Sequence, residues 1–154
     1  MVFYPHGSLA VARDYLGDET KLAVGAGGDL LDTITRRWVS GRYVPVFVSE
    51  GTSQQKVAAI RRSHYLTNVY EEVLSALGEG LVVYGWSFDE RDQHVLDAIA
   101  ANPPKRMVVS VFTGQPEPDQ QAFCHQVLRA AGRSLPDTAV TFFDSQSPGC
   151  WSNL

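Results

Sequence analysis

Three short segments of the chain combine a glycine with hydroxyl side chains, each directly after an apolar run. They are His6-Gly7-Ser8, Glu50-Gly51-Thr52-Ser53 and Gly85-Trp86-Ser87. A glycine lets the backbone approach a ligand closely, and a hydroxyl can bond a phosphate or a sugar. Ligands of open parallel sheets bind beyond the carboxyl ends of the strands. If each segment ends a strand, the three segments form one polar edge that suits a nucleotide.

The residue in these segments that is best suited to move a proton is His6. An imidazole has an unperturbed pKa of about 6.5, so it can take a proton from a sugar hydroxyl near neutral pH. A histidine that is hydrogen-bonded within a loop is the structural alternative, and the residue types do not decide between the two. We therefore treat His6 as the candidate catalytic residue.

The stretch LVVYGWSFDERDQH, residues 81–94, is apolar at its start and densely charged at its end. It fits a strand feeding a helix whose N-terminus holds an anion, an elbow that presents Ser87 as a nucleophile, or a turn that only packs. The elbow pattern is G-x-S-x-G, and Asp89 stands at its last position. His125, the histidine available for such a triad, falls within an expected helix rather than on a loop. These departures disfavour the nucleophile interpretation.

The acidic residues after this turn have an ordinary structural explanation. Carboxylates are favourable in the first turn of a helix because they meet the positive end of its dipole, which accounts for Asp89 and Glu90. Asp92, together with His94, is expected near the end of the preceding strand. Asp92 therefore stays a candidate for nucleotide binding.

The elements that must position these residues are expected to form a single α/β domain over residues 1–154. Its parts are a β-hairpin and insert (1–43), alternating strands and helices (44–145) and a tail (146–154). Alternation of this kind predicts a parallel, Rossmann-like sheet with helices on both faces. Four segments are expected to be parallel neighbours in that sheet: Val46–Ser49, Val82–Tyr84, Val108–Val111 and Val140–Phe143.

Composition excludes several classes of protein. The net charge of −4 and the scattered basic residues do not indicate a nucleic-acid footprint, so the pairs Arg36–Arg37 and Arg61–Arg62 are interpreted as solvated helix faces. No apolar run approaches the roughly 18 residues that a membrane span needs. The two cysteines, Cys124 and Cys150, cannot form a disulfide framework or a four-cysteine zinc site. We expect a cytoplasmic protein with reduced thiols, no metal, no membrane partner and no nucleic-acid partner.

The order of these motifs resembles the sirtuin-like NAD-binding domains of bacteria, and is most similar to an uncharacterised branch of that group. The resemblance rests on His6-Gly7-Ser8, a variable insert, the loop around Gly51 and Thr52, and Gly85-Trp86-Ser87 with Asp92 downstream, and it covers approximately Phe3 to Phe112. It implies that His6 is the catalytic histidine acting on the nicotinamide ribose. It also implies that Gly85 and Ser87 line the dinucleotide. Gly7, Ser8, Gly51, Thr52 and Asp92 are further candidates for binding it because they are expected at or near the ends of strands.

Two departures from that family limit what the resemblance implies. The chain lacks the four cysteines of the sirtuin zinc module, which counts against peptide deacylation and leaves NAD hydrolysis. The family's Gly-Ala-Gly loop precedes its histidine, whereas AVGAGGD at 23–29 follows His6 and is interpreted as a flexible loop.

We therefore expect the chain to resemble the carboxyl-side half of such a domain, binding NAD weakly or not at all by itself. The alternative is a non-catalytic α/β module that mediates interaction or self-association. A half-domain leaves a sheet edge and apolar contacts uncovered, so a homo-oligomer is expected.

Overall fold

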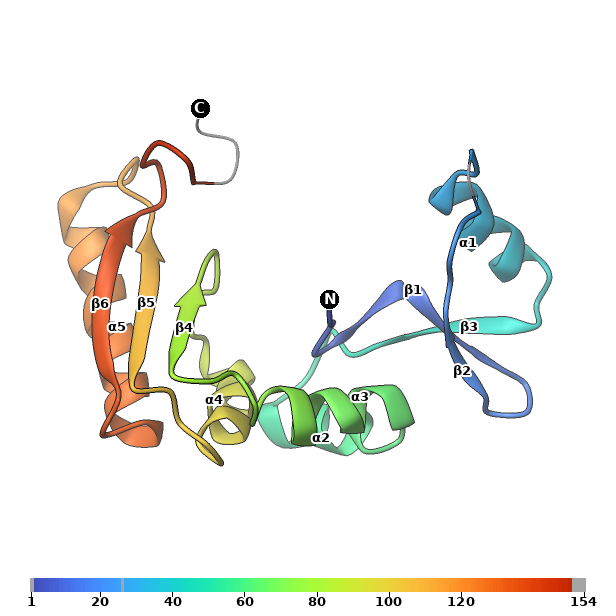
Figure 1. The fold of residues 1–154 in the computed structure, drawn as a ribbon, viewed down its shortest axis with the longest axis horizontal. Coiled ribbons are helices and arrows are strands. Elements are labelled where there is room, and N and C mark those ends of the chain that lie inside the picture. The colour runs from blue at the N-terminus through green and yellow to red at the C-terminus, as the bar shows by residue number, and fades with distance from the viewer. Residues whose placement is uncertain (1, 26, 151–154) are drawn as a thin grey trace. The chain divides into compact units, whose positions relative to one another are not determined.

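The computed structural model describes residues 2–25 and 27–150 of the chain. These residues form two compact units, the first ending at Glu72 and the second beginning at Val73. Figure 1 shows the elements of both units along the chain. Each unit has its own sheet and its own helices.

The first unit is built on a small antiparallel sheet. Its strands are β1 (Gly7–Asp14), β2 (Glu19–Lys21) and β3 (Tyr43–Phe47), in the order β2-β1-β3. β1 and β2 form the expected hairpin, with Val11 opposite Lys21. The turn between them is polar, and Asp14 accepts hydrogen bonds from the backbone of Leu16 and Asp18.

Helices follow the sheet strands where the sequence provides caps. α1 (Leu30–Val39) begins after Asp29, α2 (Ser53–Ile60) after Thr52, and α3 (His64–Asn68) after Ser63, and each of these three side chains accepts a backbone N–H. A π-helical turn, η1 (Val69–Val73), continues α3. Two clusters of buried side chains hold the unit together; the first contains Val11, Val46, Ile60 and Leu66, and the second Ala12, Leu22 and Ile34.

The expectation that the strand around Val46–Ser49 joins the parallel sheet is wrong. This strand, β3, pairs antiparallel with β1 in the first unit. The physical reason is its incomplete burial. Val46 is buried, but Val44 on the same face of the strand is 58% exposed and Phe47 on the other face is 49% exposed. A buried parallel strand is covered on both faces, whereas antiparallel strands are commonly exposed to solvent.

The placement of His6-Gly7-Ser8 at the end of a strand is also wrong. Residues 2–4 are not a strand, and the chain turns at Pro5 and His6, with the Gly7 N–H donating to the Tyr4 carbonyl oxygen at 2.9 Å. β1 begins at Gly7, so the histidine precedes the strand. Proline at the second position of a tight turn and glycine at the fourth are themselves a turn signal.

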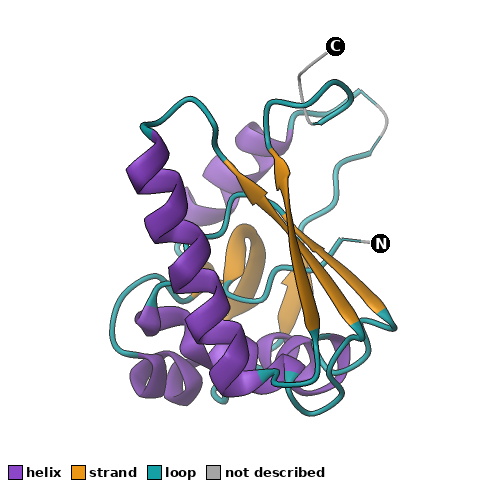
Figure 2. Ribbon diagram, turned by 90° about the vertical axis from the view of Figure 1, so that its left-hand side faces the viewer, coloured by secondary structure: helices purple, strands orange, loops and turns teal. Residues whose placement is uncertain are grey.

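The second unit contains a parallel three-stranded sheet, as the sequence predicts. β4 (Gly80–Val83), β5 (Arg106–Val111) and β6 (Ala139–Asp144) lie in the order β4-β5-β6. The first connection contains the 3-10 turn η2 (Glu90–Asp92) and the helix α4 (Gln93–Ile99), and the second contains α5 (Glu117–Ser134). Figure 2 shows α5 running beside the three strands. A mixed α/β architecture is therefore confirmed.

Helices cover only part of this sheet. Met107, Val109, Leu96 and Val127 are buried between the strands and the helices α4 and α5. Along β4, however, burial alternates, and Val82 is 69% exposed next to the buried Val83. The expected covering of both faces is therefore not seen at β4.

Two expectations fall partly outside the described residues. The loop expected at 23–29 includes residue 26, and the tail expected at 146–154 includes residues 151–154, and these five positions are not described. Within the described part of the chain, no helix is both long and apolar enough to cross a membrane.

Candidate functional site

The candidate site of the second unit is a cavity at the carboxyl ends of its parallel strands. Its volume is about 420 Å³. The loops that follow β4, β5 and β6 supply its walls. The lining residues are Tyr84, Gly85, Trp86, Ser87, Ser110, Phe112, Gln115, Phe123 and Ser145. This is the edge where open parallel sheets bind their ligands.

The loop after β4 is shaped by Gly85. This residue has φ 72°, a left-handed conformation that a side chain disfavours. Its N–H donates to the Ser110 hydroxyl of β5 at 3.1 Å. Because the hydroxyl oxygen accepts this bond, its own hydrogen can be donated elsewhere. The glycine thus joins the loop to the neighbouring strand at the wall of the cavity.

Aromatic packing fixes the rest of this loop. Trp86 stacks on Phe88 with ring centroids 4.2 Å apart, and Phe88 meets the edge of Phe123 on α5. Phe88 has φ 53°, a conformation that is uncommon for a bulky residue. The side chain of Gln126 donates to the carbonyl oxygens of Ser87 and Phe88 at 3.0 and 3.1 Å. Backbone strain that surrounding contacts hold in place is typical of ligand-binding loops.

The strand-end residues of β6 complete the cavity. The Tyr84 hydroxyl donates to the Ser145 carbonyl oxygen at 3.0 Å, and the Ser145 N–H donates to the Val111 carbonyl oxygen at 2.9 Å. These bonds connect the ends of all three strands across the sheet. Hydrogen bonds therefore fix the backbone around the cavity at the ends of β4, β5 and β6.

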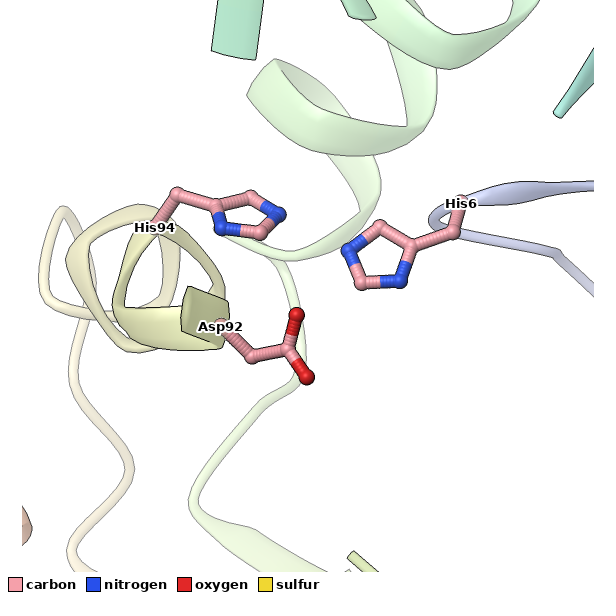
Figure 3. Close-up of side chains that lie close together, drawn as sticks. All are labelled: His6, Asp92 and His94. Atoms are coloured by element: carbon pink, nitrogen blue, oxygen red, sulfur yellow. The ribbon is translucent and has the colours of Figure 1, made fainter. Parts of the chain in front are cut away.

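Asp92 and His94 lie at the start of α4, where their side chains extend to the same side of the helix (Figure 3). His94 is buried to 1% exposure, whereas Asp92 is partly exposed. Neither residue lines the cavity that contains Gly85 and Ser87. Asp92 stands at the N-cap position of α4 but makes no capping hydrogen bond with its side chain. Asp92 therefore does not share that cavity with Gly85 and Ser87.

The candidate residues His6, Gly7 and Ser8 lie in the first unit. The His6 carbonyl oxygen accepts from the Val48 N–H at 2.7 Å, and the His6 ring is partly exposed at the turn before β1 (Figure 3). A side chain at Gly7 would overlap the Val46 carbonyl oxygen, so close pairing of β1 with β3 explains the glycine. The Ser8 hydroxyl accepts from the Ala10 N–H at 3.2 Å.

Gly51 and Thr52 also have structural roles in the first unit. Thr52 and Gln55 form a reciprocal capping box at the start of α2, with hydrogen bonds of 2.9 and 3.3 Å. Gly51 packs against the same glutamine side chain. Of the candidate nucleotide-binding residues, Gly85 and Ser87 are the two that line one cavity.

The lining of this cavity has no charged group that would bind a phosphate. None of its lining residues carries a charge. Within residues 73–154 the sequence has nine acidic and five basic side chains, which gives that unit the whole net charge of −4. The cavity therefore suits a neutral, partly aromatic group with hydroxyls better than a phosphate.

Sequence reasoning missed the parts of this site that come from the second and third strands. Ser110 lies beside the Gly-x-Ser loop and is 8% exposed. The signal that the sequence contains is a single hydroxyl within the apolar run of β5. Gln126 gave no such signal, because its partners are backbone carbonyl groups 38 and 39 positions away.

The comparison with known protein families gives one match. Residues 1–151 match a family that is described as a domain of unknown function, DUF4917. The chain belongs to this family. No curated protein and no solved structure matches the chain.

Proposed function

We propose that this DUF4917 chain is a sirtuin-like, Rossmann-like NAD-binding protein or a fragment of one, related to NAD-hydrolysing or NAD-dependent deacylating enzymes, in which the second unit holds one wall of the nucleotide site. The observation that supports the proposal is the cavity at the carboxyl ends of the parallel strands, lined by Gly85 and Ser87. These two residues are the ones that the resemblance assigns to the dinucleotide.

The chemistry of the cavity fits the nucleoside portion of such a ligand. Its volume of about 420 Å³ is at the lower end of small-molecule sites, which span about 300–1,000 Å³. Phe112 is 54% exposed at its rim and offers a ring face for a base. The hydroxyls of Ser87 and Ser110 suit a ribose.

In this proposal His6 is the catalytic base. It takes a proton during hydrolysis at the nicotinamide ribose, where water replaces nicotinamide and the bond between the ribose and the nicotinamide nitrogen breaks. Such a base must come within about 3 Å of the group from which it takes the proton. Its place on an ordered turn next to β1 suits a residue that has to be held in one position.

The chain alone is expected to bind NAD weakly and to hydrolyse it negligibly. The cavity offers no cation to the pyrophosphate, and the second unit carries the net negative charge. Correct positioning of the substrate can lower the activation barrier by about 7–11 kcal/mol. A site that holds only part of its substrate is therefore expected to lose most of its catalytic rate.

The test combines ligand binding with an activity assay on the 154-residue chain. Titration with adenosine, followed by NMR, should perturb residues around Gly85 and Ser110. Ser87→Trp should abolish these shifts because the indole fills the cavity. Thr113→Trp is the matched control, because Thr113 follows the neighbouring strand β5 but lines a different cavity.

Two results would contradict the proposal. If the adenosine-induced shifts are unchanged in Ser87→Trp, adenosine does not bind in this cavity. Rapid nicotinamide release by the chain, lost in His6→Ala, would show that the chain already contains a complete site and that the partial-site interpretation is wrong.

A non-catalytic interaction module is the second candidate function. The observation that favours it is the exposed apolar surface of β4 and of the loop after β5, where Val82, Tyr84 and Phe112 are exposed. Absence of any adenosine or NAD binding, together with self-association of the chain, would support this function instead.

A further inference from the structure

The first unit contains a second cavity of different chemistry, which the proposed function does not use. It lies beside the last turn of α1 and the start of β3 and has a volume of about 610 Å³. Arg36, Arg37 and Arg42 line it together with Thr33, Ser40 and Tyr43. The chain turns at Gly41, whose N–H donates to the Trp38 carbonyl oxygen, and this turn returns Arg42 to the side of the two helical arginines.

The positive charge of this cavity is not neutralised within the described residues. No carboxylate lines it, and within residues 2–25 and 27–150 none of its three arginines forms an ion pair. All three arginines are exposed. A surface whose only charges are three neighbouring cations attracts anions, and does so in a chain whose net charge is −4.

The side chains that are available for an anion are the guanidinium groups. The Thr33 hydroxyl donates to the Asp29 carbonyl oxygen at 2.9 Å, and the Ser40 hydroxyl donates to the Arg37 carbonyl oxygen at 2.6 Å. These two hydrogens are therefore already used. Arg36 uses one of its five N–H donors, its Nε, on the Asp32 carbonyl oxygen at 3.3 Å.

The ring of Tyr43 holds one of these groups in place. The guanidinium of Arg37 lies over that ring at 4.4 Å from the centroid. Stacking of this kind uses the face of the guanidinium and leaves its in-plane N–H groups to bond a ligand. The arginine is therefore partly preorganised, which lowers the entropy that is lost when a ligand binds.

Helix stability accounts for only part of this arrangement. Arginines in the last turn of a helix interact favourably with the negative end of its dipole, and this explains Arg36 and Arg37. It does not explain Arg42, which lies beyond the helix, or the cavity between the three side chains.

We propose that this arginine cavity binds an oligophosphate group, such as the pyrophosphate or triphosphate of a small phosphorylated ligand. Guanidinium groups bond phosphate oxygens bidentately, so three of them serve several oxygens at once. A single phosphate monoester carries a charge of about −1.5 to −2, less than the three arginines supply, and linked phosphates match them better. The proposal does not depend on the nucleoside cavity of the second unit.

A single small ligand fits these observations better than an extended nucleic acid. If the three arginines of the cavity are left out, the remaining charge of the chain is −7. A polyanion that extends beyond the cavity would be repelled by that remainder, whereas a compact oligophosphate contacts only the arginines.

The test is calorimetric titration of the full chain with sodium tripolyphosphate at low ionic strength. We expect one site, and a dissociation constant that rises at least about tenfold in the double variant Arg36→Gln/Arg42→Gln, because two charge-assisted contacts are lost. The matched control is Arg61→Gln/Arg62→Gln, which removes an exposed arginine pair after α2 in the same unit. Its dissociation constant should stay within about twofold of the unsubstituted chain. Circular dichroism checks that each variant is folded.

Four results would overturn the proposal. One is the absence of tripolyphosphate binding, and another is an equal loss of binding in the control variant. Sulfate that binds as tightly as tripolyphosphate would show a general anion surface rather than an oligophosphate site. A single-stranded oligonucleotide whose affinity exceeds that of tripolyphosphate and rises with its length would indicate nucleic-acid binding instead.

Discussion

At the scale of single residues, the strongest structural constraint on the candidate site is the conformation of Gly85. Its left-handed φ of 72° sets the direction of the loop, while its N–H bonds Ser110. No atom lies within 4 Å of where a side chain would be added. The requirement for glycine is therefore one of backbone conformation and not of space.

This distinction gives a testable prediction. Gly85→Ala should lower the free energy of unfolding by about 1–2 kcal/mol, the cost of a left-handed conformation for a residue with a side chain. It should also weaken adenosine binding, because the loop that lines the cavity relaxes. Urea unfolding and the NMR titration measure the two effects.

Gly80→Ala is the control for this prediction. Gly80 lies at the start of β4 in the same unit, has no positive φ, and also has no atom within 4 Å of an added side chain. Its substitution should leave stability unchanged or raise it by up to about 1 kcal/mol. Equal destabilisation by the two substitutions would contradict the conformational argument.

At the scale of elements, Glu19 joins three segments of the first unit. It lies on β2, and its side chain is 6% exposed. One carboxylate oxygen accepts from Arg13 on β1 at 2.6 Å. The other accepts from the Ser63 hydroxyl at 2.9 Å and from the Tyr65 N–H at 2.8 Å, at the start of α3.

These contacts lower the pKa of Glu19. Burial by itself would raise the pKa, but the hydrogen bonds from Tyr65, Arg13 and Ser63 and the charge of Arg13 outweigh it, so the pKa falls below its ordinary value of 4.5. A lowered folded-state pKa means that the carboxylate stabilises the fold above the unfolded pKa. That contribution is lost as the pH falls through the folded pKa.

We therefore predict that Glu19→Gln lowers the free energy of unfolding near pH 7 by about 1.5–3 kcal/mol, the range for hydrogen bonds to a charged group. The difference from the unsubstituted chain should shrink as the pH falls below about 4.5, where the carboxyl of the unfolded chain takes up a proton first. Urea unfolding at a series of pH values measures this difference.

Glu79→Gln is the matched control. Glu79 pairs with Lys105 at 2.5 Å, but both side chains are largely exposed. Exposed ion pairs contribute about 0–1 kcal/mol, so this variant should differ little from the unsubstituted chain at any pH. A loss in Glu19→Gln that does not depend on pH would show that packing, and not charge, is responsible.

The sequence predicts elements well where a local signal is unambiguous. The apolar runs of β5 and β6 and the hydroxyl cap of α2 are such signals, and the structure confirms all three. The run around Pro45 was ambiguous, because a short apolar run does not show whether one or both of its faces are buried.

The two cavities could likewise be predicted only where their residues are close together in the sequence. Gly85 and Ser87 could be predicted because they are close in sequence and follow a strand, and the structure places both on one cavity. The arginine cavity could not be predicted, because the adjacent pair Arg36–Arg37 has no partner in the sequence pattern. Only the turn at Gly41 brings Arg42 next to the pair.

At the scale of the whole molecule, the parallel sheet of the second unit has an outer strand with an exposed apolar surface. β4 is at one end of the order β4-β5-β6, and Val82 and Tyr84 are 69% and 46% exposed. An outer strand presents unpaired backbone N–H and C=O groups, and proteins usually protect such strands with charges or with a partner. β4 itself contains no charged side chain.

We therefore predict that the chain forms a homo-oligomer through β4. Sedimentation should show a dimer or a larger species at micromolar concentration, and Val82→Lys should shift the population to monomer, because a buried lysine without a partner opposes association. Val39→Lys is the control, since Val39 is 83% exposed on α1 and lies in the first unit. Monomer at every concentration would show that the outer strand needs no partner. A dimer that survives Val82→Lys would place the interface on another surface.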